Sequence, residues 1–392
     1  MHLKKEKKMF QLFQKKSSPF NRGKFSSKNF SFILPFEYKA GLIFIDVEIE
    51  DEKYSFLFDT GAFTILPSTL IKKLSLVKME EDLDTLDAFS EEKKLSLYQL
   101  PKLKIGELVF YDFQVASDDF IENFPLSCLA FDGVLGYNFF QELIIGIDYE
   151  SRTLTVSDNL PSLQGFTKIK LRTNAINTLE FFLQIEKQKI WMGLDTGSNG
   201  GLQFQDEKLA QILHKKKYKS QRIIGLFSSS LSGTNQQSFQ DVFLLKNFSL
   251  AKKLMINSFP IRYEENSPNL AGNGFLKHFF IIIDFKTKKL YLKKREEIIQ
   301  KVLEKSFGFF TFWSEENGLY ISAIMQGTPA YSSKLKIGDR LFSIGTRETL
   351  NFTKKDYCNF LFLAQEIDYE KEDSLELIVK RENKLLRILL TH

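Results

Sequence analysis

The alternation of hydrophobic and polar positions predicts a chain made mostly of β-strands joined by short polar turns. Residues 41–61, GLIFIDVEIEDEKYSFLFDTG, read as two strands joined by the acidic turn Glu50-Asp51-Glu52. Residues 179–197, LEFFLQIEKQKIWMGLDTG, repeat this design with a turn near Glu186-Lys187. In both stretches the second strand runs directly into the tripeptide Asp-Thr-Gly.

A short helix is predicted after each Asp-Thr-Gly. The first is PSTLIKKL at 67–74, where Pro67 and Ser68 give a start signal. The second is DEKLAQILHKKK at 206–217, where Asp206 and Glu207 do so. These two helices leave the predicted fold class as mostly β.

The two Asp-Thr-Gly stretches belong to an internal repeat. Asp59 and Asp195 are 136 positions apart, and the same shift places residues 134–156 on residues 270–292 without a gap. The matched pairs include Gly136 with Gly272, Phe139 with Phe275, Asp148 with Asp284, and Leu154 with Leu290. The sequence therefore predicts two similar lobes produced by duplication.

Composition narrows the classes of function. A chain of 392 residues with 43% hydrophobic and 14% aromatic content is long and apolar enough for two or three ordered domains. The net charge is a mild +5, and the basic residues do not gather with aromatic ones as in a nucleic-acid-binding module. We therefore expect no nucleic-acid partner.

Cysteine and histidine are scarce. Cys128 and Cys358 fall in different predicted domains, so a disulfide framework is not expected, and neither lies in a sequence typical of a thiol nucleophile. The four histidines show no ligand spacing, so neither a metal site nor a cofactor is expected. A hydrolase with a serine or cysteine nucleophile is disfavoured as well, because no nucleophile–base spacing is visible.

Residues 1–30 read as a disordered basic arm. This arm has no apolar stretch of signal-peptide length, and the longest apolar runs, such as FFIII at 279–283, are too short to cross a bilayer. We expect a protein without a transmembrane segment, cytoplasmic by default. The bacterial periplasm or envelope is the alternative, because a misplaced start codon would hide an export signal.

Two acids at the ends of buried strands can perform chemistry together. Burial disfavours the charge on each carboxylate, and the Gly after Thr permits a tight turn that brings backbone N–H groups close. The Thr hydroxyl can bond across to the other loop. Two adjacent carboxylates cannot both ionise cheaply, so one keeps a proton and the other can activate a water molecule.

The chain resembles the aspartic proteases, both retropepsin-like and pepsin-like. The resemblance lies in both Asp-Thr-Gly motifs and in the segments Val134-Leu135-Gly136 and Leu270-Ala271-Gly272. The resemblance covers residues 31–293. It implies an aspartic-type endopeptidase acting on polypeptides, built as two pseudo-symmetric, barrel-like β lobes at 31–160 and 161–295. In that family the apolar-apolar-Gly segment threads next to the catalytic loop.

Two lobes in one chain match pepsin-like stoichiometry, so we expect a monomer. The implied catalytic residues are Asp59 and Asp195, supported by Thr60, Gly61, Thr196, Gly197 and Ser198.

The two loops differ after the glycine, with Ala62 in the first and Ser198 in the second. A hydroxyl at 198 can donate one more hydrogen bond to Asp195 and favour its charged form. Our hypothesis is that Asp195 stays charged and Asp59 carries the shared proton.

Two segments are candidates for a flap over the substrate, the turn at 87–90 and the Ser/Gly-rich GLFSSSLSG at 225–233. A serine-rich loop of this kind can equally be a plain connector. Asp148 and Asp284, at strand ends before basic turns, are expected to be structural.

The C-terminal segment, 300–392, shows a different pattern. This segment resembles a PDZ domain, a small α+β module. The resemblance lies in residues 305–312, KSFGFFTF, and in residues 318–345, which contain the run G-T-P-A…L-K-I-G-D-R-L. The resemblance implies a peptide-carboxylate-binding loop at Ser306, Phe307, Gly308 and Phe309. Residues 374–390 read as a closing hairpin. Such a domain would bind C-terminal or extended peptides, recruiting substrate tails or regulating access. The alternative is a packing module with no free groove.

Two functions follow from these patterns. The first is an endopeptidase with a peptide-binding accessory domain. The second is a binding or scaffold protein whose protease lobes have lost activity. Because both Asp-Thr-Gly motifs are intact, the sequence favours the enzyme.

Overall fold

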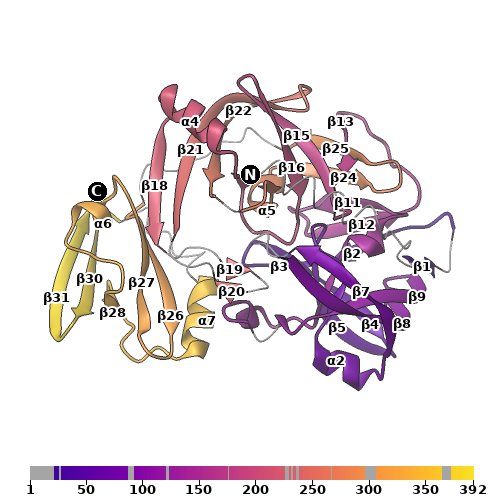
Figure 1. Cartoon of the computed structure of the whole chain (residues 1–392), viewed down its shortest axis with the longest axis horizontal. Helices are drawn as coiled ribbons and strands as arrows, with labels where there is room; N and C mark the ends of the chain where they lie inside the picture. Colours follow the sequence, from indigo (N-terminus) through magenta and orange to yellow (C-terminus); the bar gives the residue numbers. More distant parts are fainter. Residues whose placement is uncertain are drawn as a thin grey trace.

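The computed structural model shows a mostly β molecule (Figure 1). The residues that it describes are 22–25, 28–86, 92–120, 123–174, 176–225, 229–230, 233–234, 238–265, 267–295, 306–363 and 372–392.

The first part of the chain forms a barrel-like sheet in the order β1-β9-β6-β10-β5-β4-β8-β7, with β3 beside β4. Because β8 also pairs with β9, the path from β9 to β8 closes on itself. The strands are β1 (Arg22–Phe25), β3 (Glu37–Lys39), β4 (Leu42–Ile49), β5 (Glu52–Phe58), β6 (Ile65–Leu66), β7 (Val77–Leu86), β8 (Glu92–Ile105), β9 (Leu108–Ser117) and β10 (Gly133–Leu135).

Strand β1 corrects the expectation that all of residues 1–30 are disordered. Arg22 pairs with Phe113 and Phe25 with Phe110, so this short segment completes an edge of the sheet. The ring of Phe25 packs on the ring of Phe110 at 5.9 Å, an apolar anchor inside a basic stretch. The rest of the expected arm, residues 1–21 and 26–27, lies outside the described residues.

A six-stranded sheet joins the two halves of the chain in the order β13-β25-β24-β11-β12-β2. Its central strands β11 and β24 are antiparallel, and Gly146 pairs with Ile282, the position that follows it by the repeat shift. The strands are β2 (Ser31–Pro35), β11 (Ile144–Asp148), β12 (Thr153–Ser157), β13 (Thr167–Lys170), β24 (Phe279–Asp284) and β25 (Lys289–Lys294).

The second half and the C-terminal part share a fourteen-stranded sheet, in the order β14-β15-β16-β23-β17-β22-β21-β18-β27-β28-β30-β31 with β26 and β29 beside this path. The strands are β14 (Arg172–Thr173), β15 (Leu179–Ile185), β16 (Gln188–Leu194), β17 (Leu202–Phe204), β18 (Ser220–Gly225), β21 (Ser238–Leu250), β22 (Leu254–Tyr263), β23 (Leu270–Ala271), β26 (Phe309–Ser314), β27 (Gly318–Met325), β28 (Arg340–Ile344), β29 (Arg347–Glu348), β30 (Ser374–Arg381) and β31 (Lys384–Thr391). Two further short strands, β19 (Ser229–Ser230) and β20 (Gly233–Thr234), pair with each other.

The helices are short. The two predicted helices are confirmed as α2 and α4, and the Asp206 carboxylate caps α4 by accepting the N–H of Leu209 at 3.1 Å. The helices are α2 (Ser68–Lys73), α3 (Tyr137–Phe140), α4 (Glu207–Lys215), α5 (Asn273–Leu276), α6 (Pro329–Ser332) and α7 (Lys354–Leu363), with a 3₁₀ turn η2 at Leu126–Leu129.

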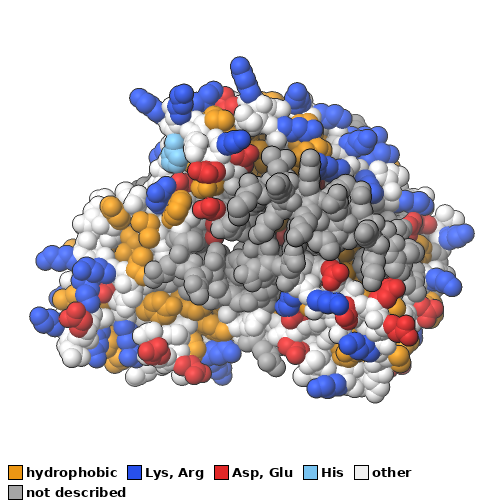
Figure 2. Space-filling model, viewed as in Figure 1, with side chains coloured by type: hydrophobic (Ala, Val, Ile, Leu, Met, Phe, Trp, Pro, Cys, Tyr) orange, Lys and Arg blue, Asp and Glu red, His pale blue; other side chains and the backbone are white. Residues whose placement is uncertain are grey.

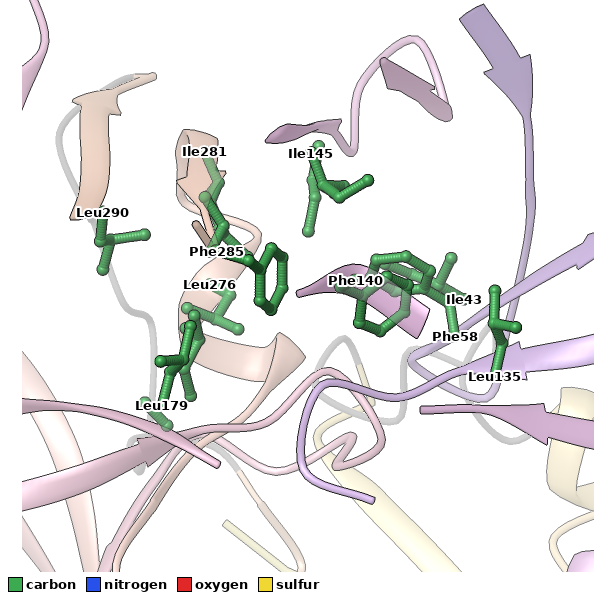
Figure 3. Close-up of a cluster of buried hydrophobic side chains, with 14 of the residues drawn as sticks. Ile43, Phe58, Leu135, Phe140, Ile145, Leu179, Leu276, Ile281, Phe285 and Leu290 are labelled. Carbon is green, nitrogen blue, oxygen red and sulfur yellow. The ribbon is translucent and has the colours of Figure 1, made fainter. Parts of the chain in front are cut away.

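One hydrophobic core spans both halves (Figure 3). The ring of Phe140, from α3, lies 4.7 Å from that of Phe58 in the first half and 5.2 Å from that of Phe285 in the second. Leu276, Ile281 and Leu290 continue the cluster on the side of Phe285. Because protein interiors are close-packed, this shared core fixes the two halves relative to each other.

The C-terminal part has its own core, and its attachments to the rest of the chain include a strand pairing and a disulfide. The first is the pairing of β18 with β27, where Ile224 lies opposite Ile324. The second is a disulfide between Cys128, in η2, and Cys358, in α7. The expectation of no disulfide was wrong, because assignment to different domains does not bound the distance between two residues in space.

Lys and Arg side chains are spread over the visible face together with Asp and Glu (Figure 2). This mixture agrees with the mild net charge of +5. Among the residues that the structure describes, none of the helices has the length and apolar character needed to cross a membrane.

Candidate active site

The two Asp-Thr-Gly loops meet through their threonines. The N–H of Thr60 donates to Thr196 Oγ1 at 3.0 Å, and the N–H of Thr196 donates to Thr60 Oγ1 at 3.1 Å. Each hydroxyl then donates to a strand of the opposite half, Thr60 to the Leu194 carbonyl at 2.7 Å and Thr196 to the Phe58 carbonyl at 2.8 Å. Both threonines are buried, so these bonds are shielded from water. The predicted bonding of the hydroxyls across the two loops is confirmed.

This lock places the two carboxyl groups next to each other, since a Cβ on Gly61 would lie 2.9 Å from Asp195 Oδ1 and 3.3 Å from Asp59 Oδ1. Asp59 is buried, whereas Asp195 keeps part of its surface exposed. A Cβ on Gly197 would lie 2.1 Å from Asp59 Oδ2, and one on Gly61 would lie 2.9 Å from Asp195 Oδ1. Each loop glycine thus leaves the room in which the acid of the other loop sits.

Backbone donors distinguish the two acids. Asp59 accepts the N–H groups of Gly61 at 2.7 Å and Ala62 at 3.1 Å. Asp195 accepts the N–H of Gly197 at 2.9 Å. Since N–H donors stabilise a charged carboxylate, Asp59 is better prepared to carry the charge.

Burial raises the pKa of Asp59 above its ordinary value, against the effect of its backbone donors. Burial and then the neighbouring Asp59 charge raise the pKa of Asp195 well above its ordinary value. The structure therefore favours the proton on Asp195, the reverse of our sequence hypothesis. Among the hydrogen bonds of the described residues, Ser198 Oγ accepts the N–H of Gly200 at 3.2 Å, and the contact of Ser198 with Asp195 is through its backbone N–H.

The apolar-apolar-Gly segments support the loops as the sequence predicts. Val134-Leu135 runs parallel to β5, and the Leu135 carbonyl accepts the N–H of Asp59 at 3.0 Å. In the second half, the Ala271 carbonyl accepts the N–H of Asp195 at 3.1 Å. A Cβ on Gly136 would lie 2.3 Å from the Ala62 carbonyl oxygen, so only glycine permits this approach.

Sequence reasoning missed two asparagines that hold these loops. Asn273 donates through Nδ2 to the Thr196 carbonyl at 2.7 Å and to the Gly41 carbonyl at 2.9 Å. Asn138 Oδ1 accepts the N–H of Thr64 at 2.9 Å. Both asparagines are buried. The sequence feature that could have indicated them is an asparagine one or two positions after the glycine of each apolar-apolar-Gly segment.

The other candidate residues have contacts of their own, with residues other than Asp59 and Asp195. In the predicted peptide-binding loop, the N–H of Gly308 donates to Ser306 Oγ at 3.1 Å, and buried Phe307 stacks on His392 at 4.4 Å. Phe309 begins β26. Asp284 accepts the N–H of Thr287 at 2.8 Å, as expected of a structural residue.

The flap candidates fall mostly outside the described residues. Residues 87–90 are not described, and neither are 226–228 and 231–232 of the second candidate. Among the residues that are described, no group of three or more His, Cys, Asp or Glu side chains is arranged to hold a metal ion.

Comparison with models of protein families gives a match within the first half of the chain. Residues 45–139 match the model of a family described as aspartyl protease. The match begins in β4 and ends in α3, so it includes the Asp59 loop and the segment Val134-Leu135-Gly136. A comparison with curated proteins finds no match. The family match supports a protease-type function.

The raised pKa of Asp195 predicts a stability effect with a defined sign. Because the folded-state pKa lies above the unfolded value of about 3.9, the native state binds more protons between these values and loses stability as pH rises. Asp195→Asn removes this loss, and its amide can still donate to Asp59. We expect the variant to be more stable than wild type at pH 7 by on the order of 1 kcal/mol, with the gain disappearing towards about pH 4.

Urea unfolding at several pH values measures this difference. Asp148→Asn is a control of opposite sign. Burial raises the pKa of Asp148, but the hydrogen bonds from Arg295, Ser151 and Glu150 together lower it below its ordinary value. Its stability loss at pH 7 should shrink as pH falls. A difference between Asp195→Asn and wild type that stays constant with pH would contradict a raised pKa at the pair of aspartates.

Proposed function

We propose that the chain is an aspartic-type endopeptidase in which Asp59 and Asp195 activate one water molecule for attack on a peptide bond. The observation that carries this proposal is the reciprocal threonine lock, which brings two acids from distant parts of the chain into contact at the end of two buried strands. The family match at residues 45–139 supports it.

The chemistry follows from the unequal surroundings of the two acids. Charged Asp59 accepts a proton from a water molecule held between the carboxyl groups, while protonated Asp195 donates a hydrogen bond to the carbonyl under attack. The water oxygen bonds to the carbonyl carbon and gives a tetrahedral intermediate. Proton transfer to the amide nitrogen then releases the amine, with no covalent bond between enzyme and substrate.

The roles of the remaining site residues follow from their contacts. Thr60 and Thr196 lock the loops, Gly61 and Gly197 leave room for the acids, and Ser198 contributes a backbone N–H near Asp195. Since one chain supplies both acids, we infer a monomer with lobes at 31–160 and 161–295. The segment 300–392 is proposed as a PDZ-type domain for C-terminal or extended peptides, with its loop at 306–309.

Digestion of a broad peptide library in H₂¹⁸O tests this function. We expect internal cleavage at mildly acid pH, with one ¹⁸O in each new carboxyl group and no covalent adduct. Activity should fall on both sides of an optimum, because the mechanism needs one charged and one protonated acid. If the folded protein cleaves no member of the library at any pH, it is a peptide-binding or scaffold protein instead.

A further inference from the structure

The two halves differ in the segment that leads to the apolar-apolar-Gly motif. In the second half residues 264–269 connect β22 to β23, whereas in the first half the longer stretch 118–132 connects β9 to β10. Part of this longer stretch, the lobe-1 insertion (residues 123–129), lies against the C-terminal part. Figure 1 shows α7 between β26 and the first half.

The ring of Phe124, in the lobe-1 insertion, packs among aromatic residues from two C-terminal elements. Its centroid lies 5.4 Å from that of Phe312 and 5.6 Å from that of Trp313, both on β26. It lies 5.3 Å from that of Tyr357 on α7, and the Lys354 ammonium is 5.6 Å from the ring. Phe124 thus fills an aromatic site between a strand and a helix.

The walls of this site are connected to each other. Trp313 Nε1 donates to the Phe352 carbonyl at 2.8 Å, and the Tyr357 hydroxyl donates to the Thr311 carbonyl at 3.3 Å. The second bond joins α7 to β26 and the first joins β26 to the segment just before α7, and neither involves Phe124. The site therefore does not need the lobe-1 insertion in order to exist.

The edge of β26 next to this site is of a kind that binds peptides. Among the strands that the structure describes, β26 pairs with β27 alone. An open strand edge beside a helix, with side-chain sites between them, suits the addition of an extended peptide.

The disulfide clamps the lobe-1 insertion over this edge. Cys128 lies shortly after Phe124 in the lobe-1 insertion, and its partner Cys358 directly follows Tyr357 on α7. The Cα atoms are 5.0 Å apart and the two cysteines are separated by 230 positions. Disulfides that persist are typical of oxidising compartments, and a dithiol reductant breaks them by thiol exchange.

We propose that the aromatic site between β26 and α7 binds peptides that present a phenylalanine side chain, that Phe124 occupies it as an internal ligand, and that a dithiol opens it by reducing Cys128–Cys358. Reduction breaks one S–S bond and leaves two thiols, while the dithiol gives up two hydrogens and becomes a disulfide. This inference rests on the proposed peptide-binding role of segment 300–392 and not on catalysis. Without the disulfide the insertion remains a tethered competitor, so opening is partial.

The probe for this site is a fluorescein-labelled peptide of residues 121–127, Ile-Glu-Asn-Phe-Pro-Leu-Ser. Its affinity is measured by fluorescence anisotropy on the full chain carrying Asp59→Asn, so that the probe is not cleaved. We expect dithiothreitol to tighten binding by at least about tenfold relative to the oxidised protein. Cys128→Ser with Cys358→Ser should bind like the reduced protein, with or without the reductant.

Adding Phe124→Ala to the double serine variant removes the internal competitor, and we expect a further gain in affinity. A probe with alanine in place of phenylalanine should bind poorly to every variant. Hydrogen exchange measured in parallel should show faster exchange in the lobe-1 insertion after reduction, with strands β27 and β30 still protected.

Equal affinity in the oxidised and reduced states, with the serine variants folded, overturns the switch. Absence of binding even with Phe124→Ala overturns the peptide site. Neither result touches the proposed protease, because cleavage of the peptide library by wild type is measured separately.

Discussion

Replacing Asp59 by Asn is expected to lower kcat for peptide hydrolysis by about 10²–10⁴-fold, with a far smaller change in KM. Asp59 is the acid with the larger set of backbone donors, from Gly61 and Ala62. An amide at this position can accept those bonds but cannot take a proton from water. The loss therefore falls on the chemical step, and kcat measured on a peptide taken from the library digest reports it.

Asp112→Asn is the matched control for this substitution. Asp112 is exposed and has a φ of 53°, a backbone conformation that asparagine tolerates as well as aspartate. The same change of an acid to an amide should leave kcat near that of wild type. If Asp59→Asn, folded and carrying its disulfide, retained wild-type kcat, the two-aspartate mechanism would be wrong.

Much of the candidate site could be predicted from sequence, because its chemistry lies in short motifs. Asp-Thr-Gly after an apolar strand defines the position of each acid along the chain. The repeat shift of 136 positions indicates which threonine faces which, as the bonds between Thr60 and Thr196 show. The turn at Glu50-Asp51 also follows from local pattern, and both residues have positive φ as in tight hairpin turns.

The placement of the shared proton could not be predicted from the motif. The sequence pattern favours a hydrogen bond from the Ser198 hydroxyl to Asp195, whereas the structure has the backbone N–H of Ser198 at Asp195 and the N–H of Gly200 at Ser198 Oγ. The backbone of the first loop turns two N–H groups onto Asp59 instead. Backbone direction within a tight loop depends on packing against the segment at Leu135, which no local pattern specifies.

Contacts between distant segments could not be predicted either. The pairing of β18 with β27 joins strand edges through backbone bonds, which almost any side chains permit. The disulfide of Cys128 with Cys358 needs the lobe-1 insertion to reach α7. Because the two motifs have the same spacing in both halves of the sequence, the longer connection is visible only in the structure. Strand β1 was missed because its single apolar anchor, Phe25, follows basic residues.

Replacing Gly197 by Ala is expected to lower kcat/KM by about 10²-fold or more and to destabilise the fold by about 1–3 kcal/mol. The added Cβ would lie 2.1 Å from Asp59 Oδ2 and 2.2 Å from its Cγ, closer than any contact between such atoms allows. Because φ at Gly197 lies outside the left-handed region, alanine meets no backbone strain there. The whole effect must come from pushing the Asp59 carboxyl group out of contact with Asp195.

Gly200→Ala provides the matched comparison within the same loop. A Cβ at this position would meet Ser198 Oγ at 3.4 Å as its nearest neighbour, a tolerable contact, so activity and stability should stay near wild type. Steady-state cleavage and urea unfolding of both variants distinguish an effect on the two carboxyl groups from an effect on the whole loop. If the two alanine variants lost activity equally, loop mobility and not the spacing of the two carboxyl groups would control the rate. If only Gly197→Ala lost activity, the rate would depend on the position of the Asp59 oxygens next to Asp195, which Gly197 permits.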